Sequence, residues 1–171
     1  MPRPGDFGLL AGYDPVDRLI RFAEWVNGDG FPLYRFPLYS HAFTLLDDDT
    51  ILEAEPGGAR IRPVTEYPAS AVTWSSWDLT DGQRAAIVAA ARQREGTPYS
   101  ALDYFSLAAH RLHIPAPGLR QYIASTGHMI CSQLEDQIYL DADLHMFSDG
   151  RWPGDVTPAA LRQVLTGPKG A

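Results

Sequence analysis

A chain of 171 residues is long enough for one compact domain, which at this size buries roughly 70% of its unfolded surface and needs no disulfide or metal for stability. Its 14 Lys and Arg against 21 Asp and Glu give a net charge of −7 without a basic run, which argues against nucleic acid and anionic membranes as partners. The chain has one cysteine, no N-terminal signal-peptide pattern and no apolar run of about 18 residues, so we expect a cytoplasmic protein that does not span a membrane.

The first half of the chain has the pattern of short strands separated by turns. Apolar and β-branched residues predict strands over residues 7–11, 40–46, 50–55, 59–64 and 71–79. The acidic run at 47–49 joins the second and third of these strands as a hairpin. An amphipathic helix is expected over residues 15–26, between the first two strands.

Helices dominate the second half of the chain. Thr80 and Gln83 form a capping-box pattern that opens an Ala-rich helix, and Gly96 closes it. Thr157, followed by Pro158, opens the last helix. Between these two, helices are expected over residues 99–111, 119–124 and 131–142. Strands early and helices late indicate a single α+β domain, with an antiparallel sheet packed against helices.

Cys131 is the only thiol and stands at the expected start of a helix, in the sequence Ile130-Cys131-Ser132-Gln133-Leu134. A helix N-terminus carries about half a positive charge, and its first backbone N–H groups lack partners within the helix. Such a position lowers the pKa of a thiol and can stabilise an oxyanion. Position alone nevertheless favours a buried structural cysteine, because free cysteines are among the most buried residues.

His41 begins a predicted strand, and two carboxylates on the next strand are candidates for its partner. A three-residue loop at 47–49 would place both carboxylates on the face of the sheet that carries His41. Glu55 would then lie directly opposite His41, and Glu53 diagonal to it. A two-residue loop would place both carboxylates on the other face. The pattern leaves the register open, and with it the choice between Glu53 and Glu55.

Other candidate sites are weaker. His110 and His113 have a spacing compatible with shared metal ligation, but no third ligand accompanies them, so we expect surface residues. Residues 47–49 lack the glycine and final glutamate of a calcium loop and predict a solvated turn. His128 competes with His41 as a base, but its place just before the cysteine helix aims it less naturally at the sulfur. We therefore expect neither a metal nor another cofactor.

Six short segments, spread over nearly the whole chain, have a distinctive order and spacing. In chain order they are Gly5-Asp6, Tyr39-Ser40-His41, Ile51-Leu52-Glu53-Ala54, Gly96-Thr97-Pro98-Tyr99, Ile130-Cys131-Ser132-Gln133-Leu134 and Gly154-Asp155-Val156-Thr157-Pro158. In this combination they resemble the circularly permuted papain-like enzymes related to the NlpC/P60 superfamily. Unpermuted papain-like enzymes have the cysteine helix before the histidine strand, whereas here His41 precedes Cys131 by 90 residues.

The resemblance implies one permuted papain-like domain over residues 1–171, with Cys131 as the nucleophile and His41 as its base. It also implies that Glu53, in the Glu-Ala pair, orients the imidazole rather than Glu55. Such an enzyme would hydrolyse an amide or ester bond through an acyl-enzyme, in a small molecule, a peptide or a peptidoglycan fragment.

Two alternatives remain, because one fold serves several functions. The first is a lipid acyltransferase or thioesterase that uses the same Cys/His pair, and the second is a non-catalytic structural module that retains the fold. For an enzyme of either kind we expect Cys131 to be partly exposed at the base of a cleft. We also expect its helix to lie across the hairpin face that carries His41, Phe43, Leu45 and Ile51.

Overall fold

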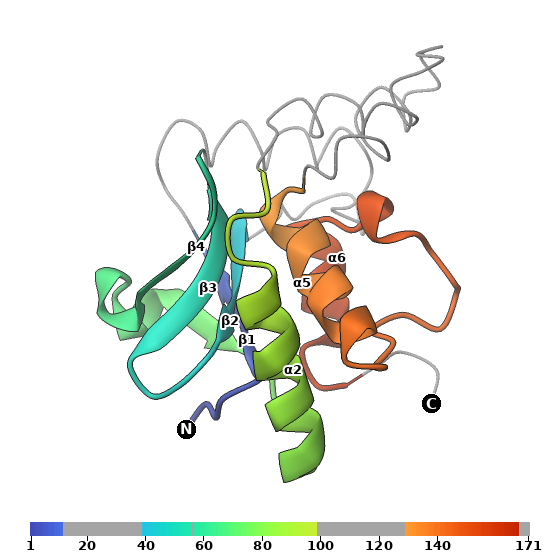
Figure 1. The fold of residues 1–171 in the computed structure, drawn as a ribbon, viewed down its shortest axis with the longest axis horizontal. Coiled ribbons are helices and arrows are strands. Elements are labelled where there is room, and N and C mark those ends of the chain that lie inside the picture. Colours follow the sequence, from blue (N-terminus) through green and yellow to red (C-terminus); the bar gives the residue numbers. More distant parts are fainter. Residues whose placement is uncertain (12–38, 56, 99–128, 168–171) are drawn as a thin grey trace.

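The computed structural model describes residues 1–11, 39–55, 57–98 and 129–167, and it shows an α+β fold (Figure 1). Within this part of the chain, five antiparallel strands form one sheet in the order β4-β3-β2-β1-β5. The strands are β1 (Phe7–Leu10), β2 (His41–Leu45), β3 (Thr50–Glu55), β4 (Gly58–Pro63) and β5 (Val72–Trp74). All five were predicted, and the largest difference is β5, which ends well before residue 79.

Three α-helices of the described part also agree with the sequence pattern. They are α2 (Asp81–Gln93), α5 (Cys131–Asp141) and the single turn α6 (Pro158–Leu161). The same ranges also contain the short 3-10 helices η1 (Val64–Glu66), η2 (Ala69–Ala71), η3 (Pro153–Asp155) and η4 (Arg162–Val164). The predicted capping box opens α2, since Thr80 Oγ1 accepts the N–H of Gln83 and Gln83 Oε1 accepts the N–H of Thr80. The helices predicted over 15–26, 99–111 and 119–124 lie outside the described residues.

None of the helices in these described ranges combines the length and apolar character that crossing a membrane requires.

The β2–β3 hairpin has the three-residue loop and the register that place both carboxylates beside His41. Phe43 pairs with Glu53 across the strands, and Leu46 N–H donates to the carbonyl of Thr50 at 2.9 Å. Asp47 holds the turn, because its carboxylate accepts the backbone N–H groups of Asp49 at 3.0 Å and Thr50 at 2.7 Å. The acidic run is therefore a hairpin turn, as the sequence predicted, and the structure adds that its first side chain stabilises it.

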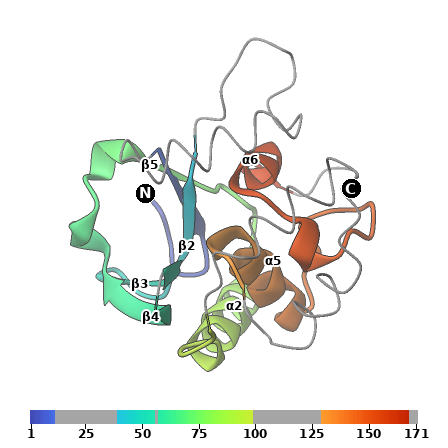
Figure 2. The same cartoon turned by 90° about the horizontal axis from the view of Figure 1, so that it is seen from above.

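α5 packs on the opposite face of the hairpin from the one that we expected. The buried cluster around α5 contains Cys131, Leu134 and Ile138 together with sheet residues of the other face, which are Phe7, Leu9, Ala42, Leu46, Leu52 and Ala54. α2 joins the same cluster, so the helices lie to one side of the sheet (Figure 2). The prediction that the cysteine helix lies across the face of Phe43, Leu45 and Ile51 is therefore wrong.

The chain after β4 explains why the helix lies where it does. It folds over the expected face, and Val64, Tyr67, Val72 and Trp74 pack there against Phe43, Leu45 and Ile51 as a second, smaller cluster. Both faces of the hairpin are apolar, so the hydrophobic pattern alone could not choose between them. With one face covered locally, the other is left for α5 and α2.

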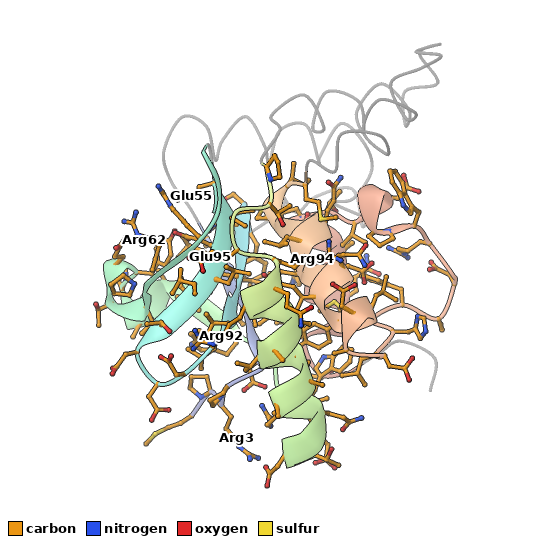
Figure 3. All side chains as sticks on the ribbon, viewed as in Figure 1. Arg3, Glu55, Arg62, Arg92, Arg94 and Glu95 are labelled. Carbon is orange, nitrogen blue, oxygen red and sulfur yellow. The ribbon has the colours of Figure 1, made fainter. Side chains whose placement is uncertain are left out.

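Ion pairs link the end of α2 to its neighbours on two sides, through Arg92 in the last turn and Arg94 at the C-cap (Figure 3). Arg92 pairs with Asp47 in the hairpin turn at 3.2 Å, and Arg94 pairs with Asp141 at the end of α5 at 2.6 Å. Partly exposed pairs of this kind contribute at most about 1 kcal/mol each. The apolar cluster between the helices and the sheet therefore carries most of the packing energy.

Candidate functional site

His41 and Cys131 come together although α5 lies on the unexpected face of the sheet. His41 is the first residue of β2, and the N-terminus of α5 lies at the same end of the sheet (Figure 1). From this end position the imidazole forms a hydrogen bond with Glu53, and it lies close enough to Cys131 for that side chain to raise its pKa. A histidine in the middle of the strand would face away from the helix, so the placement at the strand end is what lets the two side chains meet.

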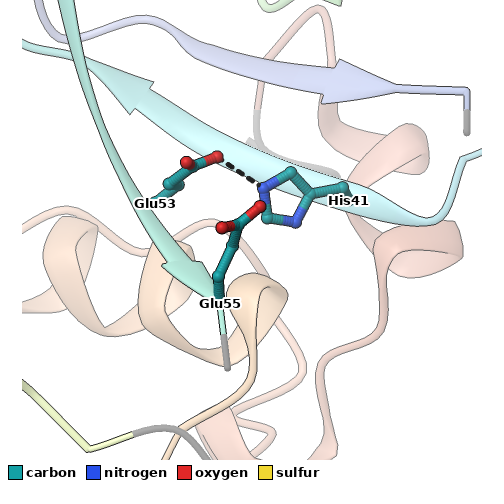
Figure 4. A group of neighbouring side chains, drawn as sticks. All are labelled: His41, Glu53 and Glu55. Carbon is teal, nitrogen blue, oxygen red and sulfur yellow. Dashed lines mark hydrogen bonds and ion pairs between the residues drawn. The ribbon is translucent and has the colours of Figure 1, made fainter. Parts of the chain in front are cut away.

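Glu53, rather than Glu55, is the carboxylate bonded to the imidazole (Figure 4). The distance from His41 Nε2 to Glu53 Oε2 is 2.9 Å, and the Glu53 side chain is only 1% exposed. Glu55 lies on the same face but is more exposed and pairs with Arg60. Sequence pattern left the choice between the two open, and the diagonal position across the strands proves to be the bonded one.

The surroundings favour a charged imidazole. Burial alone would lower the pKa of His41, but the hydrogen bonds to Cys131 and Glu53, together with their negative charges, outweigh it and raise the pKa to about 10. Burial would likewise raise the pKa of Glu53, yet hydrogen bonds from His41 and Tyr67 hold it below its usual value. At neutral pH the geometry therefore supports an imidazolium between the Glu53 carboxylate and the Cys131 sulfur.

Tyr67 is a site residue that the sequence analysis missed. Its hydroxyl donates to Glu53 Oε2 at 2.6 Å, and its ring stacks on Phe43 with 5.2 Å between the centroids. Burial and the nearby carboxylates raise the pKa of Tyr67 well above its usual value, so the hydroxyl remains a donor. No signal around Glu66-Tyr67-Pro68 pointed to this role, because the contact arises only when the chain after β4 folds back over the sheet.

Cys131 is more buried than expected. It is 2% exposed and belongs to the main core cluster, so the prediction of a partly exposed thiol is wrong. Its position at the first turn of α5 agrees with the prediction. The two residues after it anchor the helix start, since Ser132 Oγ donates to the carbonyl of Val156 at 2.8 Å and Gln133 Nε2 donates to that of Gly154 at 2.9 Å.

Glu135 is a second residue that the analysis of the sequence missed. It lies four residues after Cys131, on the buried side of α5, and it is 0% exposed. Thr44 Oγ1 on β2 donates to one of its oxygens. A glutamate at helical spacing within an apolar stripe is unusual, and this spacing is the signal that could have found it.

One group of side chains has a geometry that a metal ion could use. Ligand atoms of His41, Glu53 and Glu55 lie within 4.8 Å of one another (Figure 4). Two features oppose a metal here: Nε2 of His41 bonds to Glu53 and holds its proton up to about pH 10, and Glu55 is paired with Arg60. The bond between His41 and Glu53 and the ion pair between Glu55 and Arg60 therefore account for these three side chains without a metal ion. His110, His113 and His128 lie outside the described residues.

A pocket of about 740 Å³ lies on the face of the sheet away from α5. Its lining is mostly apolar and includes Leu45, Val64, Tyr67, Val72 and Trp74. Neither the cysteine nor the histidine of the site belongs to this lining, so we do not assign the pocket to a substrate of the thiol.

No protein-family model matches the chain, and a comparison with curated proteins finds no significant match. The site is therefore defined by its own geometry, which is a thiol at a helix N-terminus, an imidazole and a buried carboxylate in series.

Proposed function

We propose that the chain is a cysteine-dependent hydrolase that cleaves an amide or ester through an acyl-enzyme. The single observation that carries the proposal is that Cys131, at the N-terminus of α5, interacts with His41, which in turn forms a hydrogen bond with Glu53. Nucleophile, base and orienting carboxylate in this order form the common arrangement of acyl-transfer enzymes. Because Nε2 of His41 is bonded to Glu53, Nδ1 is left for the sulfur.

In the proposed reaction the Cys131 thiolate attacks the carbonyl carbon and forms a tetrahedral oxyanion. The positive end of the α5 dipole stabilises both the thiolate and the oxyanion. His41 then gives its proton to the leaving group, and a neutral imidazole remains beside the acyl-enzyme. It takes a proton from the attacking water, and hydrolysis regenerates the thiolate. Glu53 keeps the ring oriented and stabilises its charge throughout.

A circularly permuted papain-like domain is the fold that we propose for this mechanism. The α+β architecture, a cysteine helix packed on an antiparallel sheet and a histidine at the start of a strand support it. The Glu-Ala pair at Glu53 and the order of histidine before cysteine support it from the sequence. The proposed substrate is a peptide, a peptidoglycan fragment or another small amide or ester. We rank a lipid acyl substrate lower, because the apolar pocket lies on the other side of the sheet from the sulfur.

A trapped acyl-enzyme is the direct test of this function. We expect a p-nitrophenyl ester to release a burst of one equivalent of nitrophenolate and to leave its acyl group on the peptide that contains Cys131. Because the chain has one cysteine, thioester formation in the intact protein can be assigned to this residue by mass spectrometry. A panel of amides and esters then identifies the preferred bond. Steady release without a burst, with the acyl group on lysines, would contradict the proposal.

A further inference from the structure

Glu135 is a buried ionisable group that the proposed mechanism does not use. It lies one turn after Cys131 on α5, and residues four apart on a helix have about 5–6 Å between their Cβ atoms. The carboxyl group therefore lies on the sulfur side of the site, whereas Glu53 lies beyond the imidazole. The charges of both Cys131 and His41 act on it, which places Glu135 within the electrostatic reach of the pair.

The contacts of Glu135 favour a neutral acid. One oxygen accepts a hydrogen bond from Thr44, but the other, Oε1, is buried and has no partner among the described residues. A bare carboxylate oxygen in the core is costly, because nothing there replaces the water that it loses. Burial raises the pKa of Glu135 to about 8; the Thr44 hydrogen bond and His41 lower it, and the Cys131 charge raises it.

Few other titratable groups face Glu135. On α5 itself they are Cys131 and Tyr139, whose pKa burial keeps well above its usual value, and on β2 the group is His41. Strand β3, α2, η3 and α6 also pack against α5, but among the described residues they supply no charge that shifts the pKa of Glu135. The protonation of this carboxyl is therefore coupled mainly to the state of the thiol and the imidazole.

We propose that Glu135 is a positioning residue of the Cys131–His41 pair, buried beside the sulfur and oriented by Thr44. It remains a neutral acid in the working enzyme. Its ionisation sets the upper pH limit of the site. The inference rests on the proposed function. A second anion next to the sulfur opposes both the thiolate and the oxyanion that follows from it. Turnover therefore declines above about pH 8, before His41 loses its proton at about pH 10.

The charge beside the sulfur can be measured without a substrate, by comparing two alkylating reagents. Iodoacetate is an anion and iodoacetamide is neutral, but both attack the same thiolate. The ratio of their rates therefore cancels the amount and nucleophilicity of thiolate, and it reports the local charge. In the wild type we expect this ratio to fall at least about threefold between pH 7 and 9, which is the effect of one unit charge at about 6 Å in bulk water.

Two variants give matched comparisons. Glu135→Gln keeps the shape and an acceptor for Thr44 but cannot ionise, so its ratio should stay flat over the same range. Thr44→Val removes the hydroxyl that favours the charged form, so the fall should occur at higher pH. A packing role alone would predict neither the flat profile nor the shift. The proposal would be overturned if the rate ratio depended on pH equally in the wild type and in Glu135→Gln, or if its fall in Thr44→Val occurred at the wild-type pH. If Glu135→Gln does not fold, the comparison with Thr44→Val decides alone.

Stability gives a second readout of the same proton. The folded protein keeps the proton on Glu135 up to about pH 8, whereas an unfolded glutamate releases it near pH 4.5. The wild type therefore loses stability between these values relative to Glu135→Gln, and the gap between their unfolding midpoints should widen with pH and then level off. A gap that is constant with pH would contradict a buried neutral acid. If His41→Ala alkylates like the wild type, the proposed function fails, but the reagent ratio still tests Glu135.

Discussion

Replacing Cys131 by alanine is expected to lower the hydrolysis of an activated ester by about a thousandfold or more, to the rate in buffer. The thiol is the only one in the chain, and no described group beside it can replace its sulfur as the nucleophile. Initial rates of nitrophenolate release, measured at neutral pH and corrected for the uncatalysed reaction, give the comparison.

The folded state of this variant is its control. Alanine is close in size to cysteine and apolar, so the core position is filled almost as before and the unfolding midpoint should stay within a few degrees. His41→Ala should show a comparable loss, because removing either member of a coupled pair disables both. A Cys131→Ala variant that keeps a tenth of the wild-type rate would show that the reaction occurs elsewhere.

Glu53→Gln is expected to lower kcat by about 10²- to 10⁴-fold while the fold is retained. The carboxylate is buried and accepts hydrogen bonds from both His41 and Tyr67, so its charge is a main reason that the imidazole stays protonated. Both hydrogen bonds reach the same oxygen, Oε2, so the glutamine oxygen can still accept them, but the substitution removes the negative charge. We expect the pKa of His41 to fall, which NMR titration of the imidazole would measure.

Glu55→Gln is the matched control on the same strand and the same face. Its carboxylate pairs with Arg60 and does not bond to the imidazole, so we expect kcat within about threefold of the wild type. The reverse outcome, with a large loss in Glu55→Gln and none in Glu53→Gln, would contradict the assignment of the third residue.

The hairpin is the part of the site that the sequence predicted best. Alternation along both strands and the acidic loop were sufficient to propose the register that pairs Phe43 with Glu53. Sequence could not exclude the two-residue loop, because the deciding contacts are the hydrogen bonds that Asp47 accepts within the turn. Once the register is known, both carboxylates share the face of His41, and the remaining choice depends on the diagonal reach of one side chain.

Residues that act across long sequence distances were not predictable in the same way. The face taken by α5 depends on the chain after β4 covering the other side, and Tyr67 reaches Glu53 as part of that covering. β5 ends early because the following residues turn toward the helices, where Trp77 Nε1 donates to the carbonyl of Val164 at 2.6 Å. Local propensity and alternation contain no information on these contacts, which only the assembled layers create.

The central claim is that Cys131 and His41 form a thiolate–imidazolium pair, and the rate of iodoacetamide alkylation as a function of pH tests it most directly. With one cysteine in the chain, every alkylation event reports this thiol, and its burial slows wild type and variant alike. The wild-type rate should reach its plateau at a lower pH than the rate of His41→Ala, because the charged imidazole beside the sulfur stabilises the thiolate. In His41→Ala the rate should instead follow an ordinary thiol with a pKa of about 8.5. Superimposable profiles for the two proteins would contradict the pair and the mechanism built on it.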